Sequence, residues 1–112
     1  MSKLTIVLAD DHHVVRQGLQ SLLETEPDMS IVGDTDNGPE AIKLVQQLQP
    51  DILVVDLMMP GINGIEVARQ VKKLSPATNV VILSMYGNES YVIEALRAGA
   101  KALFSKSLQQ AN

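Results

Sequence analysis

Five polar or charged residues stand where short apolar runs of the sequence end, and their types could do chemistry together. They are Asp10, Asp11, Asp56, Ser84 and Lys106. In an open parallel sheet, ligands bind at the carboxyl ends of the strands, so we expect these side chains to converge if the apolar runs are parallel strands. The site would then contain three carboxylates, a hydroxyl and an ammonium group.

Three converging carboxylates require a cation, since two of them about 4 Å apart repel by roughly 4 kcal/mol at an effective dielectric constant near 20. The chain has no cysteine and no histidines at ligand spacing. Hard oxygen ligands favour Mg²⁺, which keeps several waters and accepts only a few protein carboxylates. Because Mg²⁺ and Lys106 could together offset the charge of a phosphoryl group, phosphoryl chemistry is the leading hypothesis.

Asp56 is the candidate nucleophile. It is followed by a segment in which Pro60, Gly61 and Gly64 permit a tight loop, with free backbone groups beside the carboxylate.

Asp10 and Asp11, taken alone, have a different interpretation, because Asp also favours the N-terminal cap of a helix. The adjacent His12 and His13 would point about 100° apart on a helix and could not share a metal ion. We therefore expect both histidines to be surface residues.

Short β-branched apolar runs alternate with stretches of helical periodicity along the whole chain. The runs predict five strands, at residues 4–9, 29–33, 52–55, 80–83 and 102–104. Four helix candidates lie between them. This alternation implies right-handed crossovers and an α/β domain in which helices cover both faces of a parallel sheet.

Each predicted helix has an apolar stripe expected to face the sheet. The stripes are Val15, Leu19, Leu22 and Leu23; Ala41, Leu44, Val45 and Leu48; Val67, Val71 and Leu74; and Val92, Ala95 and Leu96. Arg16 should point away from the first stripe. Asn37 can cap the second helix with Pro39 in its first turn, and Gly99 can cap the end of the fourth.

Length and composition favour one domain over residues 1–112. Nine basic and thirteen acidic residues give a net charge of −4, so this segment alone should not bind DNA. The first apolar run is too short for a signal peptide, and no stretch approaches the roughly 20 apolar residues of a membrane span. With no cysteine, these features favour a cytoplasmic protein.

Four segments resemble the receiver domains of bacterial two-component response regulators, and the match covers essentially the whole chain. They are Leu8-Ala9-Asp10-Asp11-His12 with Val15-Arg16-Gln17-Gly18-Leu19; Val54-Val55-Asp56-Leu57-Met58-Met59-Pro60-Gly61 with Asn63-Gly64; Ile82-Leu83-Ser84-Met85-Tyr86; and Glu94-Ala95-Leu96-Arg97-Ala98-Gly99-Ala100. The first is similar to receivers of the nitrate-response and nitrogen-fixation (LuxR-type helix-turn-helix) subfamily. The resemblance implies a flavodoxin-like (CheY-like) doubly wound, five-stranded parallel sheet of order 2-1-3-4-5.

The resemblance also implies roles. Asp56 would accept a phosphoryl group from a sensor histidine kinase. Asp11 and Asp56 would bind Mg²⁺ directly, Asp10 through water, and Met58 through its backbone carbonyl. Ser84 would donate a hydrogen bond to the phosphoryl group and Lys106 would pair with its charge. Such a domain catalyses only its own phosphorylation and dephosphorylation, and it controls an output, here transcription, through a DNA-binding domain that this chain lacks.

Two departures from the family pattern affect how phosphorylation would be communicated. Leu103 stands where many receivers have an aromatic switch residue. Ser107 and Gln110 have the spacing of a capping box, which predicts the start of a fifth helix that ends early at Asn112. The alternative is that a Ser and a Gln in a polar tail share this spacing by chance. A truncated or missing fifth helix should expose apolar surface beside the first helix and favour a homodimer or a domain-swapped dimer.

Three other functions remain open at this point. A Mg²⁺ phosphohydrolase with an Asp nucleophile shares the chemistry, but its usual second Asp would fall at Met58. A flavin or dinucleotide carrier would need a Gly-rich turn after the first strand, where Asp10 and Asp11 stand instead. A receiver-like module that is never phosphorylated would not need the complete acidic set.

Overall fold

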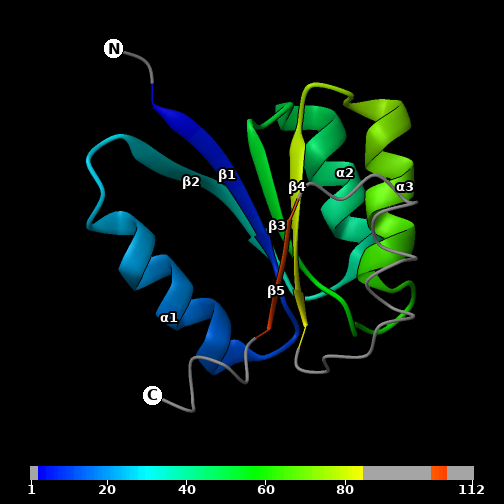
Figure 1. The fold of residues 1–112 in the computed structure, drawn as a ribbon, viewed down its shortest axis with the longest axis horizontal. Coiled ribbons are helices and arrows are strands. Elements are labelled where there is room, and N and C mark those ends of the chain that lie inside the picture. The colour runs from blue at the N-terminus through cyan, green and yellow to red at the C-terminus, as the bar shows by residue number, and fades with distance from the viewer. Residues whose placement is uncertain (1–2, 85–101, 106–112) are drawn as a thin grey trace.

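The computed structural model describes residues 3–84 and 102–105 (Figure 1). The elements in chain order are β1 (Leu4–Ala9), α1 (His13–Glu24), β2 (Met29–Thr35), α2 (Gly38–Leu48), β3 (Ile52–Asp56), α3 (Gly64–Leu74), β4 (Asn79–Ser84) and β5 (Ala102–Ser105). All five predicted strands are present within two residues of their expected bounds. The predicted fourth helix and the segment from Lys106 onward lie outside the described residues.

The five strands form one parallel sheet in the order β2-β1-β3-β4-β5, as expected. The central strands β1 and β3 pair with each other from Ile6–Ile52 to Ala9–Val55. The register between β1 and β2 shifts after Ile6, where β2 accommodates an extra residue. The two central strands therefore end side by side. Asp10 follows the last residue of β1, and Asp56 is the last residue of β3.

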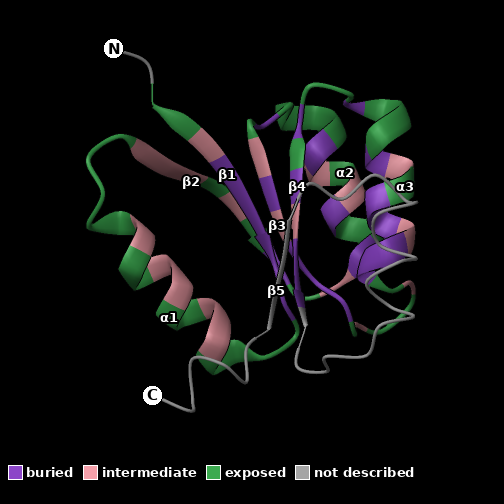
Figure 2. Cartoon of the chain, in the orientation of Figure 1, coloured by how far each residue is buried: buried purple, intermediate pink, exposed green. Residues whose placement is uncertain are grey.

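Helices lie on both sides of the sheet, with α1 on one side and α2 and α3 on the other (Figure 1). The main core fills the space between the sheet and the α2–α3 pair, and buried residues concentrate there (Figure 2). Inward residues of β1 and β3, such as Val7 and Leu53, pack with Val45 and Val71 of the helices. None of the helices in the described part of the chain is long and apolar enough to cross a membrane.

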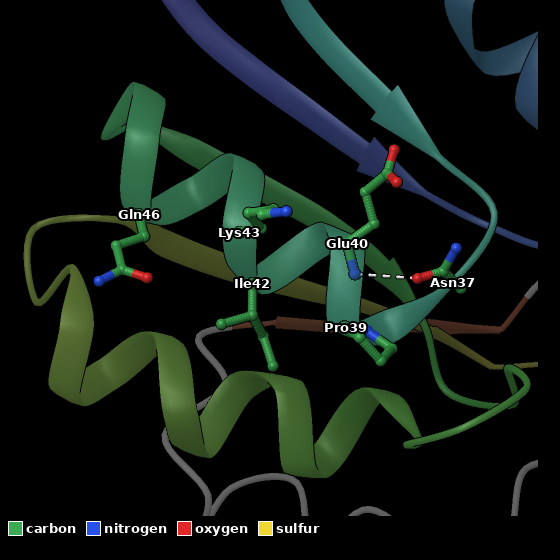
Figure 3. Close-up of a pocket in the computed structure, with 6 residues that line it drawn as sticks. All are labelled: Asn37, Pro39, Glu40, Ile42, Lys43 and Gln46. Carbon is green, nitrogen blue, oxygen red and sulfur yellow. Dashed lines mark hydrogen bonds between the residues drawn. The ribbon is translucent and has the colours of Figure 1, made fainter.

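Side-chain caps begin α2 and α3, which are the helices that pack against this core. Asn37 accepts a hydrogen bond from the backbone N–H of Glu40 at 2.9 Å (Figure 3), and Pro39 lies in the first turn, as predicted. Asn63 accepts from the N–H of Glu66 at 3.0 Å in the same way. The cap at Asn63 fixes where α3 starts, directly after the loop that follows Asp56.

The apolar stripes were only partly correct. Leu22 is 63% exposed, and Leu48 and Leu74 are exposed at the ends of α2 and α3. No residue of α1 is fully buried. Periodicity identifies one face of a helix, but the depth of burial along that face depends on how much of the neighbouring layer covers it.

Gly64 allows α3 to approach the strand that carries Asp56. A Cβ on Gly64 would lie 2.6 Å from the carbonyl oxygen of Asp56 and 3.0 Å from the Cα of Leu57. Both neighbours are backbone atoms, so they cannot move aside by changing rotamer. The N–H of Gly64 also donates to the carbonyl of Leu57 at 2.8 Å, which ties the start of α3 to the end of β3.

We expect Gly64→Ala to lower the free energy of unfolding by about 1–3 kcal/mol, because the new methyl group would force backbone apart. Gly18→Ala is the matched control, since its Cβ would meet nothing within 4 Å. In the interior of α1 it should raise stability by about 0.5–1 kcal/mol. Urea denaturation of the two variants measures both effects, and equal changes would contradict the close approach of α3.

Candidate functional site

The carboxyl ends of β1 and β3 bring Asp10 and Asp56 together. Ala9 pairs with Val55 in the parallel ladder, so the residues that follow them are neighbours at the sheet edge. Asp10 is 1% exposed and Asp56 is 2% exposed, whereas Asp11 is open to solvent. Carboxylates are rarely buried to this extent unless they have partners, so this edge of the sheet is the candidate site.

His12 completes a compact group with the three aspartates. One ligand atom from each of Asp10, Asp11, His12 and Asp56 lies within 4.8 Å of the others. The Nδ1 atom of His12 is 3.1 Å from Asp10 Oδ1, 3.2 Å from Asp11 Oδ1 and 3.4 Å from Asp56 Oδ2. Half of the His12 side chain is exposed, as expected of a surface residue, but its position beside the three aspartates was not predicted.

The alternative role of Asp10 and Asp11 as helix caps is not observed. The N-cap of α1 is His12, its side chain makes no capping hydrogen bond, and the first turn of α1 contains no acidic residue. Instead, Asp10 Oδ1 accepts a hydrogen bond from the backbone N–H of His12 at 2.8 Å. This bond orients the Asp10 carboxylate toward the acidic group.

Asp56 sits at the end of β3, and backbone contacts define the loop that follows it. The N–H of Leu57 donates to the carbonyl of Leu83 at 2.8 Å, which anchors this point to β4. The N–H of Met58 lies 3.5 Å from Asp56 Oδ1. Gly61 has a φ of +88°, a conformation that few residues other than glycine adopt, so the predicted tight loop is present.

Arg16 supports the candidate site through the backbone of Asp10. The sequence pattern did not identify this role, because helical periodicity placed Arg16 on the outward face of the helix. Its guanidinium donates to the backbone carbonyl of Asp10 and pairs with Asp34 of β2 through Nε at 3.2 Å. The side chain is only 16% exposed. Arg16 therefore ties α1 and β2 to the residue that begins the acidic group.

The remaining predicted site residues lie at the neighbouring strand ends or outside the described part of the chain. Ser84 is the last residue of β4, one position after Leu83, which pairs with Asp56. Lys106 is outside the described residues and directly follows β5. Leu103 lies in β5 in register with Ile82.

The donor set fits a divalent cation. Asp10, Asp11 and Asp56 supply hard carboxylate oxygens from two strand ends, which is the ligand chemistry that Mg²⁺ prefers. A separate shallow pocket lies over α2, lined by Asn37, Pro39, Glu40, Ile42, Lys43 and Gln46 (Figure 3). It contains none of the three aspartates, so it is not the candidate cation site.

Glu66, in the first turn of α3, lies outside the candidate cation site, and its neighbours stabilise the charged form of its carboxyl group. The side-chain hydrogen bond from Gln70, together with a hydrogen bond and charge attraction from Arg69, lowers the pKa of Glu66 below its usual 4.5. It remains charged at neutral pH, at the helix end where negative charge is favourable.

Comparison with known proteins agrees with this architecture. The family model for the response regulator receiver domain matches residues 6–112. The transcriptional regulatory protein DegU of Brevibacillus brevis is 36% identical over 96% of this chain and 45% of its own length. The nitrate/nitrite response regulator NarL of Escherichia coli is 36% identical over 94% of this chain and 49% of its own length.

A solved receiver domain gives the same result for the fold. The signal receiver domain of a NarL response regulator from Mycobacterium tuberculosis superposes with a TM-score of 0.91 at 31% identity, covering 95% of this chain and 86% of that one. The chain spans about half the length of the curated relatives it matches. This chain therefore belongs to the family of response regulator receiver domains, whose relatives here are transcription regulators of two-component systems.

Proposed function

We propose that Asp56 is the phosphoacceptor of this receiver and that it takes a phosphoryl group from a sensor histidine kinase. The observation that carries the proposal is the burial of the Asp56 carboxylate, 2% exposed, beside Asp10 and Asp11 at the carboxyl edge of the sheet. A carboxylate oxygen of Asp56 would form the new P–O bond as the P–N bond of a phosphohistidine breaks. The leaving imidazole keeps the electron pair and takes up a proton.

Mg²⁺ is the cofactor that we propose for this site. Asp11 and Asp56 would bind it directly, Asp10 through water, and Met58 through its backbone carbonyl. When bound, the ion would offset the negative charge that develops on the phosphoryl oxygens. Ser84 would donate a hydrogen bond to one of these oxygens, and the ammonium group of Lys106 would pair with another.

The receiver would act as a switch and not as an enzyme that turns over external substrates. Arg16 and the cap at Asn63 hold the two ends of the site in place, so that little reorganisation is needed when the phosphoryl group arrives. We propose that the acyl phosphate changes how a transcriptional output domain engages DNA in the cytoplasm. The acyl phosphate would later be hydrolysed at the same site.

Intact mass measurement tests the proposal. Wild-type protein is incubated with a small acyl phosphate donor and Mg²⁺, and separately with the donor and a chelator. We expect one base-labile phosphoryl group per chain with Mg²⁺ and none with the chelator. An adduct that forms equally in both samples, or repeated turnover of phosphomonoesters, would contradict the assignment.

We further propose that this chain self-associates through α1. Val14 is 79% exposed and Leu22 is 63% exposed on this helix. Large exposed apolar side chains favour association when they form a continuous patch. In sedimentation experiments we expect a concentration-dependent dimer that Leu22→Ser weakens. A strictly monomeric wild-type protein at high concentration would contradict this interface and the domain-swapped alternative.

A further inference from the structure

The position of His12 suggests a property of the cation site beyond Mg²⁺ binding. We propose that His12 is a nitrogen ligand of this site and that the site binds imidazole-seeking dications such as Ni²⁺ or Cu²⁺ through four side chains, Asp10, Asp11, His12 and Asp56. This inference deepens the proposed function, because it rests on the same carboxylates holding a cation.

The distances around His12 match those of a coordination shell. Its Nδ1 atom lies 3.1, 3.2 and 3.4 Å from one oxygen each of Asp10, Asp11 and Asp56. Two neighbouring ligand atoms bound to one metal ion at about 2.0–2.1 Å lie roughly 2.8–3.0 Å apart in octahedral geometry and roughly 3.3–3.4 Å apart in tetrahedral geometry. The nitrogen, which contacts Asp10 Oδ1 at hydrogen-bond distance, is thus already near ligand spacing from all three carboxylates.

The backbone explains why His12 reaches the site and His13 does not. His12 is the N-cap of α1, with the extended angles φ −89° and ψ 105°, so its side chain leaves the chain before the helix begins. Its N–H is also fixed to Asp10 Oδ1 at 2.8 Å. His13 is the first helical residue, and its Nδ1 lies 3.4 Å from a nitrogen of Arg16 instead.

The type of donor decides which ions would use His12. Mg²⁺ prefers oxygen ligands and water, so it would be held by the carboxylates with little contribution from imidazole. Imidazole nitrogen suits Ni²⁺, Cu²⁺ and Zn²⁺, and affinity for nitrogen and oxygen sites rises from Mn²⁺ to Cu²⁺. Two classes of dication would therefore compete for the same aspartates, and only one class would use the histidine.

The exposure of His12 is compatible with this division. Half of its side chain is open to solvent. The ring can therefore turn out when Mg²⁺ and its waters occupy the carboxylates, without leaving a cavity in the main core, of which His12 is not a member.

The test compares wild-type protein with His12→Ala and with His13→Ala as the matched control. Ni²⁺ affinity is measured by calorimetry and Mg²⁺ affinity by NMR titration. We expect His12→Ala to weaken Ni²⁺ binding by about tenfold or more, because it removes one of four ligands, while Mg²⁺ affinity changes by less than about twofold. His13→Ala should leave both affinities unchanged.

Spectroscopy gives a second readout that a structural role would not produce. Electron spin-echo spectra of the Cu²⁺-loaded protein should show coupling to an imidazole nitrogen in wild type and His13→Ala, and none in His12→Ala. Equal losses of Ni²⁺ and Mg²⁺ affinity in His12→Ala, or no loss of Ni²⁺ affinity, would overturn the inference. If wild-type protein bound neither ion, the cation site of the proposed function would fail as well, whereas Mg²⁺ binding that is indifferent to His12 leaves that function standing.

Discussion

Asp56→Asn is expected to abolish phosphoryl acceptance by this chain completely. An amide lacks the anionic oxygen that would attack phosphorus, and it removes one of three negative charges from the proposed Mg²⁺ site. The substitution is nearly isosteric, and Asp56 lies in a buried position at the end of β3, so the fold should be retained. The measurement is the intact mass of the variant after incubation with donor and Mg²⁺.

Asp51→Asn is the matched control for this loss. Asp51 immediately precedes the same strand but lies at the opposite end, where its Oδ2 accepts hydrogen bonds from the backbone N–H and the hydroxyl of Thr5. We expect its phosphorylation to equal that of wild type. A phosphoryl group that persists on Asp56→Asn, or that disappears from a folded Asp51→Asn, would show that another residue is the acceptor.

Leu53→Ala is expected to lower the free energy of unfolding by about 2–5 kcal/mol, the range found for buried leucines that leave a cavity. Leu53 is fully buried in β3 between Val7 of β1 and Val80 of β4. Since domains are stable by only about 5–15 kcal/mol, this one change should remove a large part of the total. Thermal and urea denaturation measure it.

Leu22→Ala provides the comparison, because Leu22 is 63% exposed on α1. At a protein concentration low enough to dissociate the proposed dimer, it should change stability by no more than about 0.5 kcal/mol. Phosphorylation of Leu53→Ala should fall only as its folded fraction falls, since the site lies three residues further along β3. If Leu22→Ala lowered the free energy of unfolding as much as Leu53→Ala does, the core would not be where the structure places it.

The strands and the three aspartates could be predicted from the sequence because both depend on local signals. Buried parallel strands appear as short β-branched runs, and the direction of the strands then brings Asp10 and Asp56 to one edge. The same reasoning identified Asn37 as a helix cap, because capping needs only residues a few positions apart.

The features that could not be predicted depend on contacts between distant segments. The clash that makes glycine necessary at position 64 involves the backbone of Asp56, which periodicity does not describe. Arg16 has the spacing of an outward residue but reaches back to Asp10 and across to Asp34. His12 was judged as a helical residue, whereas it precedes the helix; its place directly after two aspartates was the available signal.

Localising the phosphoryl group by borohydride reduction tests the central claim most directly. Hydride converts an aspartyl phosphate to homoserine with release of phosphate, which marks the acceptor in the peptide chain. After incubation with donor and Mg²⁺, reduction and digestion, mass spectrometry should find homoserine at position 56 and at no other aspartate. Homoserine at another aspartate, or a phosphoryl group that survives reduction on a different residue type, would contradict the account.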